Sequence, residues 1–254
     1  MRLSGLPFCA LLLALPLGLG GQSPDARVAQ ADALYAARDA AGALALYEAV
    51  VKDRQDDYEA LWKASRTATD LGEFEASAPL RESLFTRAQL YGERAMKANA
   101  ADAEGHFALA RAIGRVALAA GVKERVRLAG EVRTHALDAL AHNAQHAGAM
   151  DVMGMWNAEI MRLNGIERVF AKTFLRGKVM GEANWDAAVH YLEQSVALEP
   201  DRIVHHLDLA GVYRDVGKKD RARAQYEWIA RAQAAEFNDA NYKKQAADAL
   251  RGLK

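Results

Sequence analysis

The sequence predicts an all-α protein made of repeated helical hairpins, and three observations support this fold class. Its 254 residues contain only five prolines and are 51% hydrophobic, a composition that favours helices. Apolar residues recur at helical spacing, and no stretch alternates apolar and polar residues for long enough to predict a strand. Matching residues also recur 34 positions apart, as from Ala188 to Ala222 and from Pro200 to Ala234. Such a period indicates an array in which each hairpin packs on the next.

The hairpin over residues 200–234 shows this spacing most clearly. Ala210 and Ala222 are small enough to let two antiparallel helices approach closely. Gly217 stands where the first helix should end, a position that favours positive φ. The bulky residues beside the contact are Leu209, Tyr213 and Tyr226. The pattern resembles the tetratricopeptide repeat, and this resemblance implies a solenoid of helical hairpins.

The same offsets return along the chain. In the first hairpin they fall on Leu34, Ala43 and Tyr47. We therefore expect a tetratricopeptide-type solenoid over residues 22–254, with about five hairpins. The segment 239–254 is expected to form a capping helix with a polar outer face, which a solenoid needs for solubility.

The middle three hairpins carry long insertions. Gly72 and Ala88 are further apart than Gly217 and Ala222, so about eleven residues are inserted between the paired helices of the second unit. In the third unit the stretch VKERVRL is expected to lengthen the link to a helix over 134–141. The longest insertion, IERVFAKTFLRGKVMGEAN, interrupts the fourth unit.

The N-terminus predicts export. Arg2 precedes an apolar run over 6–19, and small residues at 18 and 20 provide a cleavage site. The run is shorter than the ~20 residues that span a bilayer, so we expect a cleaved signal peptide over 1–20 and a periplasmic or secreted protein. An uncleaved N-terminal anchor is the alternative. Cys9 is the only cysteine and would leave with the signal, so disulfides and thiol chemistry are not expected in the mature chain.

Charge narrows the class of partner. Lys+Arg and Asp+Glu balance at 33 each, whereas general binders of nucleic acids or anionic membranes carry a basic excess. We therefore expect a protein or peptide partner, with no nucleic acid, no stable membrane insertion of the mature chain and no cofactor. The oligomeric state is not predicted.

A narrower resemblance runs from Leu61 to the C-terminus. The segments that carry it, in order, are GHFALARAIGRVA, AMDVMGMWNAEIMRLNGIERVFAKTF, WDAAVHYLEQSVALEP and NDANYKKQAADAL. Their order resembles the regulator of microtubule dynamics family, which includes exported bacterial members. The resemblance implies the fold and no catalytic motif. It implies a microtubule-regulator-like binding protein only if the chain stays in the cytoplasm.

Solenoids of this type usually bind through their concave surface, which one face of the first helix of each hairpin lines. Trp62 and Arg66 are four residues apart, as are Phe107 and Arg111, so each aromatic ring lies beside an arginine. Such pairs would suit an extended peptide with apolar side chains and a carboxylate. Alternatively, the rings pack on the insertions and the arginines pair with nearby acids. The residues predicted on this face are Trp62, Arg66, Phe107, Arg111, Arg115, Asp151, Met155, Glu159, Leu207 and Arg214.

The insertion over 166–181 places apolar and aromatic residues at helical spacing on one side and basic residues on another. It could dock an acidic partner or lipid headgroup, or its aromatic side could pack on the array while its basic side stays in solvent. The residues of this predicted patch are Arg168, Phe170, Lys172, Phe174 and Arg176.

Histidines supply the only hint of metal chemistry. His142 and His146 are four residues apart, and His205 adjoins His206, but spacing fixes no third ligand and the HExxH pattern is absent. The sequence also lacks a Gly-rich phosphate loop and a Gly-x-Ser-x-Gly elbow. We therefore expect no metal site, no catalytic residues and a non-catalytic scaffold. A metal-dependent enzyme that uses histidines near the middle insertion is the remaining alternative.

Overall fold

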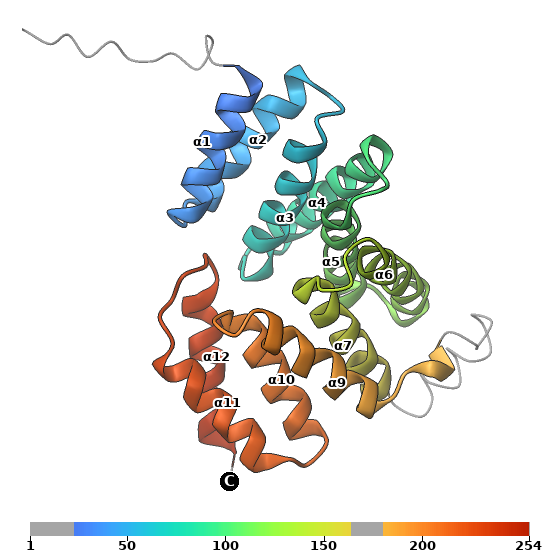
Figure 1. Cartoon of the computed structure of the whole chain (residues 1–254), viewed down its shortest axis with the longest axis vertical. Helices are drawn as coiled ribbons and strands as arrows, with labels where there is room; N and C mark the ends of the chain where they lie inside the picture. The colour runs from blue at the N-terminus through green and yellow to red at the C-terminus, as the bar shows by residue number, and fades with distance from the viewer. Residues whose placement is uncertain (1–22, 164–179, 254) are drawn as a thin grey trace, which may run out of the picture.

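The computed structural model describes residues 23–163 and 180–253, and every regular element within them is helical. Five hairpins follow one another and then a single helix, as predicted (Figure 1). The first three hairpins pair α1 (Pro24–Ala36) with α2 (Ala40–Asp53), α3 (Tyr58–Glu73) with α4 (Ala78–Ala98), and α5 (Ala103–Ala119) with α6 (Val122–His142). The last two pair α7 (Ala147–Arg162) with α9 (Trp185–Leu198), and α10 (Ile203–Asp215) with α11 (Lys219–Arg231), before the cap α12 (Asp239–Gly252). A short 3-10 turn, η2 (Met180–Glu182), precedes α9.

Polar residues fix where several helices begin. A side-chain oxygen just before a helix accepts a hydrogen bond from a backbone N–H of the first turn, which has no partner inside the helix. Asp39 does this for α2, Asp57 for α3 and Asn184 for α9, at 2.8–2.9 Å. The tight turn between α10 and α11 passes through Gly217 at φ +76, the positive φ that the sequence predicted there.

Small residues line the contact between the paired helices of every hairpin, and we call this contact the seam. In the second hairpin Ser65 replaces alanine, and its hydroxyl donates a hydrogen bond of 2.8 Å to the carbonyl of Ala88. In the fourth, a Cβ on Gly154 would lie 2.5 Å from Leu192, so only glycine fits. The seam alanines that are 0% exposed are Ala31, Ala43, Ala88, Ala110, Ala136, Ala188, Ala210 and Ala222.

The insertions in the second and third hairpins are helical rather than loops. About eleven residues make three turns of α-helix, so they extend α4 without rotating its apolar face out of register. The extension buries Phe85, whose ring lies 2.5 Å from where a Cβ on Gly72 would stand. In the third hairpin the prediction of a longer link before a helix over 134–141 was wrong, because α6 runs unbroken from Val122 to His142.

The array curves until its C-terminal end meets its second hairpin (Figure 1). The amide of Asn238 donates a hydrogen bond of 2.9 Å to the carbonyl of Asp70, and the hydroxyl of Tyr242 donates one of 2.8 Å to Glu73. The ring of Tyr242 also meets that of Phe74 edge to face at 5.5 Å. These contacts, here called the closing contacts, join the start of α12 to the end of α3 and enclose the concave face.

Across the helices that the structure describes, none is both long and apolar enough to cross a bilayer.

Candidate functional site

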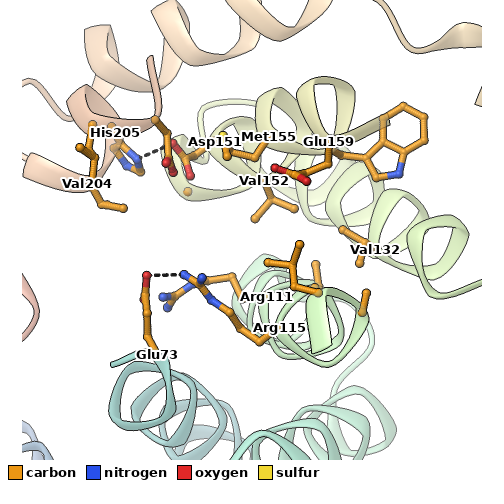
Figure 2. Close-up of a pocket in the computed structure, with 18 of the residues that line it drawn as sticks. Glu73, Arg111, Arg115, Val132, Asp151, Val152, Met155, Glu159, Val204 and His205 are labelled. Atoms are coloured by element: carbon orange, nitrogen blue, oxygen red, sulfur yellow. Dashed lines mark ion pairs between the residues drawn. The ribbon is translucent and has the colours of Figure 1, made fainter. Parts of the chain in front are cut away.

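The enclosed concave face contains a pocket with a volume of about 360 Å³. Residues of α3, α5, α6, α7, α10 and the start of α12 line it, so hairpins far apart in sequence contribute to one cavity. Figure 2 shows Arg111 and Arg115 of α5 facing Asp151 and Met155 of α7 across this space. The size lies within the range usual for ligand pockets.

The arginines of α5 are already neutralised by acids of α3. Arg111 pairs with Asp70 at 2.9 Å, and Arg115 pairs with Glu73 at 2.6 Å. The hydroxyl of Tyr35 donates a further bond of 2.6 Å to Asp70. Since both arginines have carboxylate partners, they hold α3 against α5 before any ligand enters.

His205 lies between two carboxylates at the opposite wall. Its Nδ1 is 3.0 Å from Asp151 and its Nε2 is 3.0 Å from Glu199. Burial alone would lower the pKa of His205, but Asp151 and then Glu199 outweigh it and raise the pKa to about 9. The hydrogen bond from His205 and the charge of Arg202 lower the pKa of Glu199 to about 2. His205 is therefore a buried cation at neutral pH.

Asp208, one turn along α10 from His205, has no such partner. Within the described part of the chain, no hydrogen bond or ion pair reaches its carboxyl group. Burial first, and then the negative charge of Asp151, raise its pKa well above the usual range. This wall of the pocket therefore carries an acid that a cationic group of a ligand could satisfy.

The other half of the pocket is apolar. Trp156 forms part of it, and its indole N–H donates a hydrogen bond of 2.7 Å to the carbonyl of Ala129, which fixes the ring. The apolar residues of this half come from α6 and α7 and include Val126, Val132, Val152, Met155 and Ile160. Figure 2 shows Val132 on the side of the pocket away from Glu73 and His205, and Val152 beside Glu159.

Most of the residues that the sequence placed on the concave face line this pocket. Phe107 lies at its floor and is 7% exposed, with its ring packed so closely on Gly148 that a Cβ there would lie 2.5 Å away. Arg111 stands 5.7 Å from that ring. The predicted residues that line the pocket are Phe107, Arg111, Arg115, Asp151, Met155, Glu159 and Leu207.

The others lie outside the pocket lining. Trp62 packs on the N-terminal core, and the guanidinium of Arg66 lies 4.0 Å from the ring of Tyr35 and 5.1 Å from that of Trp62. Arg214 is half exposed and lies 3.6 Å from Asp215. The predicted patch within the insertion lies outside the described residues; its members are Arg168, Phe170, Lys172, Phe174 and Arg176.

Sequence reasoning allowed that the arginines pair with nearby acids, as Arg111 does with Asp70, but it did not identify the acids. Asp70 follows Arg66 by one helical turn, so continuing the stripe of Trp62 and Arg66 along α3 would have found it and then Glu73. No comparable signal existed for Tyr242, which lines the pocket only because the array closes.

The histidines singled out by spacing have structural partners. His146 caps α7, with its Nδ1 accepting a hydrogen bond of 3.0 Å from Ala149. His206 stacks on Trp228 with ring centroids 3.6 Å apart. His142 stacks on His106 at 5.4 Å instead of facing His146. Therefore His142 and His146 do not form a shared face of metal ligands, and neither do His205 and His206.

Comparisons with known proteins agree with this architecture. The family model described as Regulator of microtubule dynamics protein 1-3 matches residues 27–254. The chain belongs to this family. Regulator of microtubule dynamics protein 1 of Bos taurus is 24% identical over 230 residues, 88% of this chain and 70% of that protein. The Mus musculus protein of the same name is 24% identical over 232 residues, covering 89% and 73%.

Among solved structures, TTC0263, a thermophilic TPR protein of Thermus thermophilus, superposes with a TM-score of 0.65 at 23% identity. The alignment covers 90% of this chain and 100% of that one, so the two share the tetratricopeptide fold.

Proposed function

We propose that this member of the family is a non-catalytic module that binds another protein by taking a peptide segment or helix end into the closed concave pocket. The tetratricopeptide-type fold supports a protein-binding scaffold, since such arrays bind along their concave surface. The observation that carries the proposal is the pocket of about 360 Å³ that the closing contacts create on that surface.

The charges of the pocket favour a basic segment. A ligand carboxylate would compete with Asp70 for Arg111 and with Glu73 for Arg115. A lysine or arginine side chain would instead meet Asp208, which makes no direct ion pair with a described residue and feels Arg115 and His205 only through their charges. An adjoining apolar side chain would fill the space beside Val152 and Met155. The partner segment is therefore a basic residue next to an apolar one, rather than the carboxylate-bearing peptide that the sequence suggested.

The composition of the lining supports binding over covalent catalysis by a hydroxyl, thiol or amine nucleophile of Ser, Thr, Cys or Lys. Among the described residues that line the pocket there is no serine, threonine, cysteine or lysine to act as a nucleophile. His205 is held as a cation between two carboxylates, a state unsuited to a general base at neutral pH.

We also propose that binding takes place in the cell envelope or outside the cell, after removal of residues 1–20. The pattern of Arg2 and the apolar run over 6–19 supports this location. The relatives are named as regulators of microtubule dynamics, so regulation of microtubules is the second candidate for a chain kept in the cytoplasm. Fractionation and N-terminal sequencing of the chain from its own cells would distinguish the two.

Photo-crosslinking tests the pocket. A photoreactive residue replaces Met155 in the pocket or, as control, Arg214 outside it, and mass spectrometry identifies the crosslinked peptide. The synthetic peptide is then titrated into the wild type, Val152→Trp, Asp208→Asn and Arg214→Ala by calorimetry. We expect Val152→Trp to weaken binding at least ~100-fold by filling the pocket, and Asp208→Asn about tenfold by removing a buried charge partner.

Arg214→Ala should bind as the wild type does. Equal affinity of Val152→Trp and the wild type would show that the peptide binds elsewhere. A crosslinked peptide without lysine or arginine would contradict the charge preference and leave the site intact.

A further inference from the structure

A second group of chemically active side chains lies outside the pocket, at the far end of the third hairpin. His106 belongs to α5, and His135 and Asp138 lie three residues apart on one face of α6. The Nδ1 atoms of the two histidines are 3.4 Å apart, and Nδ1 of His106 is 3.7 Å from a carboxylate oxygen of Asp138. One ligand atom from each residue lies within 4.8 Å of the other two.

These separations match a tetrahedral metal site. Bonds of about 2.0–2.1 Å from a zinc ion to nitrogen or oxygen ligands place neighbouring ligand atoms about 3.3–3.4 Å apart. The two Nδ1 atoms of His106 and His135 are already at that distance, and the Asp138 oxygen is slightly further away. A shared proton between the two rings is the competing explanation, and it would not require Asp138.

The backbone orients His106 as a ligand. Its Nε2 lies 3.1 Å from the carbonyl oxygen of Ala100, which can only accept a hydrogen bond. Nε2 therefore carries a proton, so in the tautomer with Nδ1 unprotonated the lone pair of Nδ1 is directed toward His135 and Asp138. A carbonyl that accepts from the second ring nitrogen is the usual support of a metal-bound histidine. His106 is 6% exposed and cannot turn freely, because the ring of His142 also stacks on it.

The surrounding charge favours a cation. The carboxylates of Asp138, Glu131 and Glu93 all act electrostatically on His135. Two imidazoles and one carboxylate suit zinc and similar ions better than calcium or magnesium, which prefer oxygen ligands. Three protein ligands leave one position of a tetrahedron for water.

We propose that His106, His135 and Asp138 bind one divalent first-row transition-metal ion, with Zn²⁺ as the probe. The ion joins α5 to α6 at the end of the hairpin that also supplies Arg111 and Arg115 to the pocket. None of the three ligands lines the pocket, so metal binding and peptide binding can be measured separately.

Calorimetry of Zn²⁺ with the untagged full-length chain, stripped with chelator, tests the site. We expect one ion per chain for the wild type and binding at least ~10-fold weaker for His135→Gln and Asp138→Asn, because each loses a ligand. His190→Gln is the matched control, since His190 is exposed, lies on α9 and contributes no ligand atom to the cluster. Circular dichroism of each variant shows whether it is folded, and Co²⁺ absorption reports tetrahedral geometry.

Absence of Zn²⁺ binding to the wild type would overturn the proposal. So would undiminished affinity of a folded Asp138→Asn variant, which would leave a proton shared between two histidines as the better account. A tenfold loss in His190→Gln would overturn this ligand set.

Discussion

The seam between paired helices and the lining of the concave pocket follow opposite rules. The seam is lined by small residues in every hairpin, with 0% exposed alanines at equivalent positions such as Ala43 and Ala222. The pocket lining differs from hairpin to hairpin, with Arg111 in the third, Asp151 in the fourth and Asp208 in the fifth. Repetition therefore specifies the architecture, while the departures from repetition supply the chemistry.

The two regions also differ in what stabilises them. The seam depends on close packing of small and apolar groups, which does not respond to pH. The lining depends on ion pairs such as Arg111–Asp70 and His205–Asp151, in which each charge is buried away from water and lies next to an opposite charge. Perturbing one region at a time should therefore give effects of different size and different pH dependence.

The largest effect is expected from the seam. Leu192 is 0% exposed and packs on Gly154, so Leu192→Ala should leave a cavity and lower the free energy of unfolding by about 2–5 kcal/mol. Urea denaturation followed by circular dichroism measures this loss. Leu198→Ala on the same helix is the control, because Leu198 is 37% exposed and its truncation should cost less than about 1 kcal/mol. Similar losses for both variants would contradict a packed seam.

A smaller, pH-dependent effect is expected from the lining. The pKa of His205 is raised from 6.5 to about 9, so the folded state binds its proton more tightly than the unfolded state does. The resulting stability is fully present below pH 6.5 and is lost as the pH rises through about 9. We expect a fall in the free energy of unfolding on the order of 1–3 kcal/mol between these pH values.

Denaturation of the wild type and His205→Gln across this range provides the measurement. The variant should lose the slope, because glutamine does not titrate. Asp208→Asn is a second variant for comparison. The pKa of Asp208 is also raised above its usual 3.8, so the folded state binds this proton more tightly too. The contribution of Asp208 to the free energy of unfolding therefore also falls as the pH rises, but the fall begins at a lower pH than for His205. A wild-type stability that does not change between pH 6.5 and 9 would contradict the buried His205 cation.

The smallest effect is expected at the closing contacts. Tyr242→Phe removes the hydrogen bond of 2.8 Å to Glu73 and should cost about 0.5–1.5 kcal/mol. Hydrogen exchange should become faster in α12 while the first hairpin stays unchanged, because the closing contacts join α12 to α3 of the second hairpin. Tyr191→Phe is the control, as no hydrogen bond joins the Tyr191 hydroxyl to the described residues. Equal exchange of α12 in both variants would mean that closure does not depend on this bond.

The fold was predictable because its determinants are local. The offsets among Leu209, Ala210, Tyr213 and Ala222 reflect two helices in contact within one hairpin, and Gly217 marks the turn between them. The same residue spacing gave a wrong prediction at residues 122–142, where it suggested a long link but the chain forms one helix, α6. Spacing measures how many residues separate two contacts but does not say what shape they take.

The candidate site was predictable only in part. Register placed Arg111 and Arg115 on the concave face, but it could not show that Asp70 and Glu73 neutralise them. The cluster of His106, His135 and Asp138 joins two helices whose relative register the insertion in the third hairpin sets, so spacing did not suggest it.

By itself, the sequence determined the helical hairpins, their number and the face each one buries, because these follow from contacts within a hairpin or between neighbours. Tertiary structure alone decided that the array closes and what the pocket contains. Asn238 contacts Asp70 only because the small rotations between several successive hairpins accumulate, and no local sequence pattern encodes the total curvature. The physical reason is that curvature accumulates along a solenoid, whereas the sequence period reports each repeat separately.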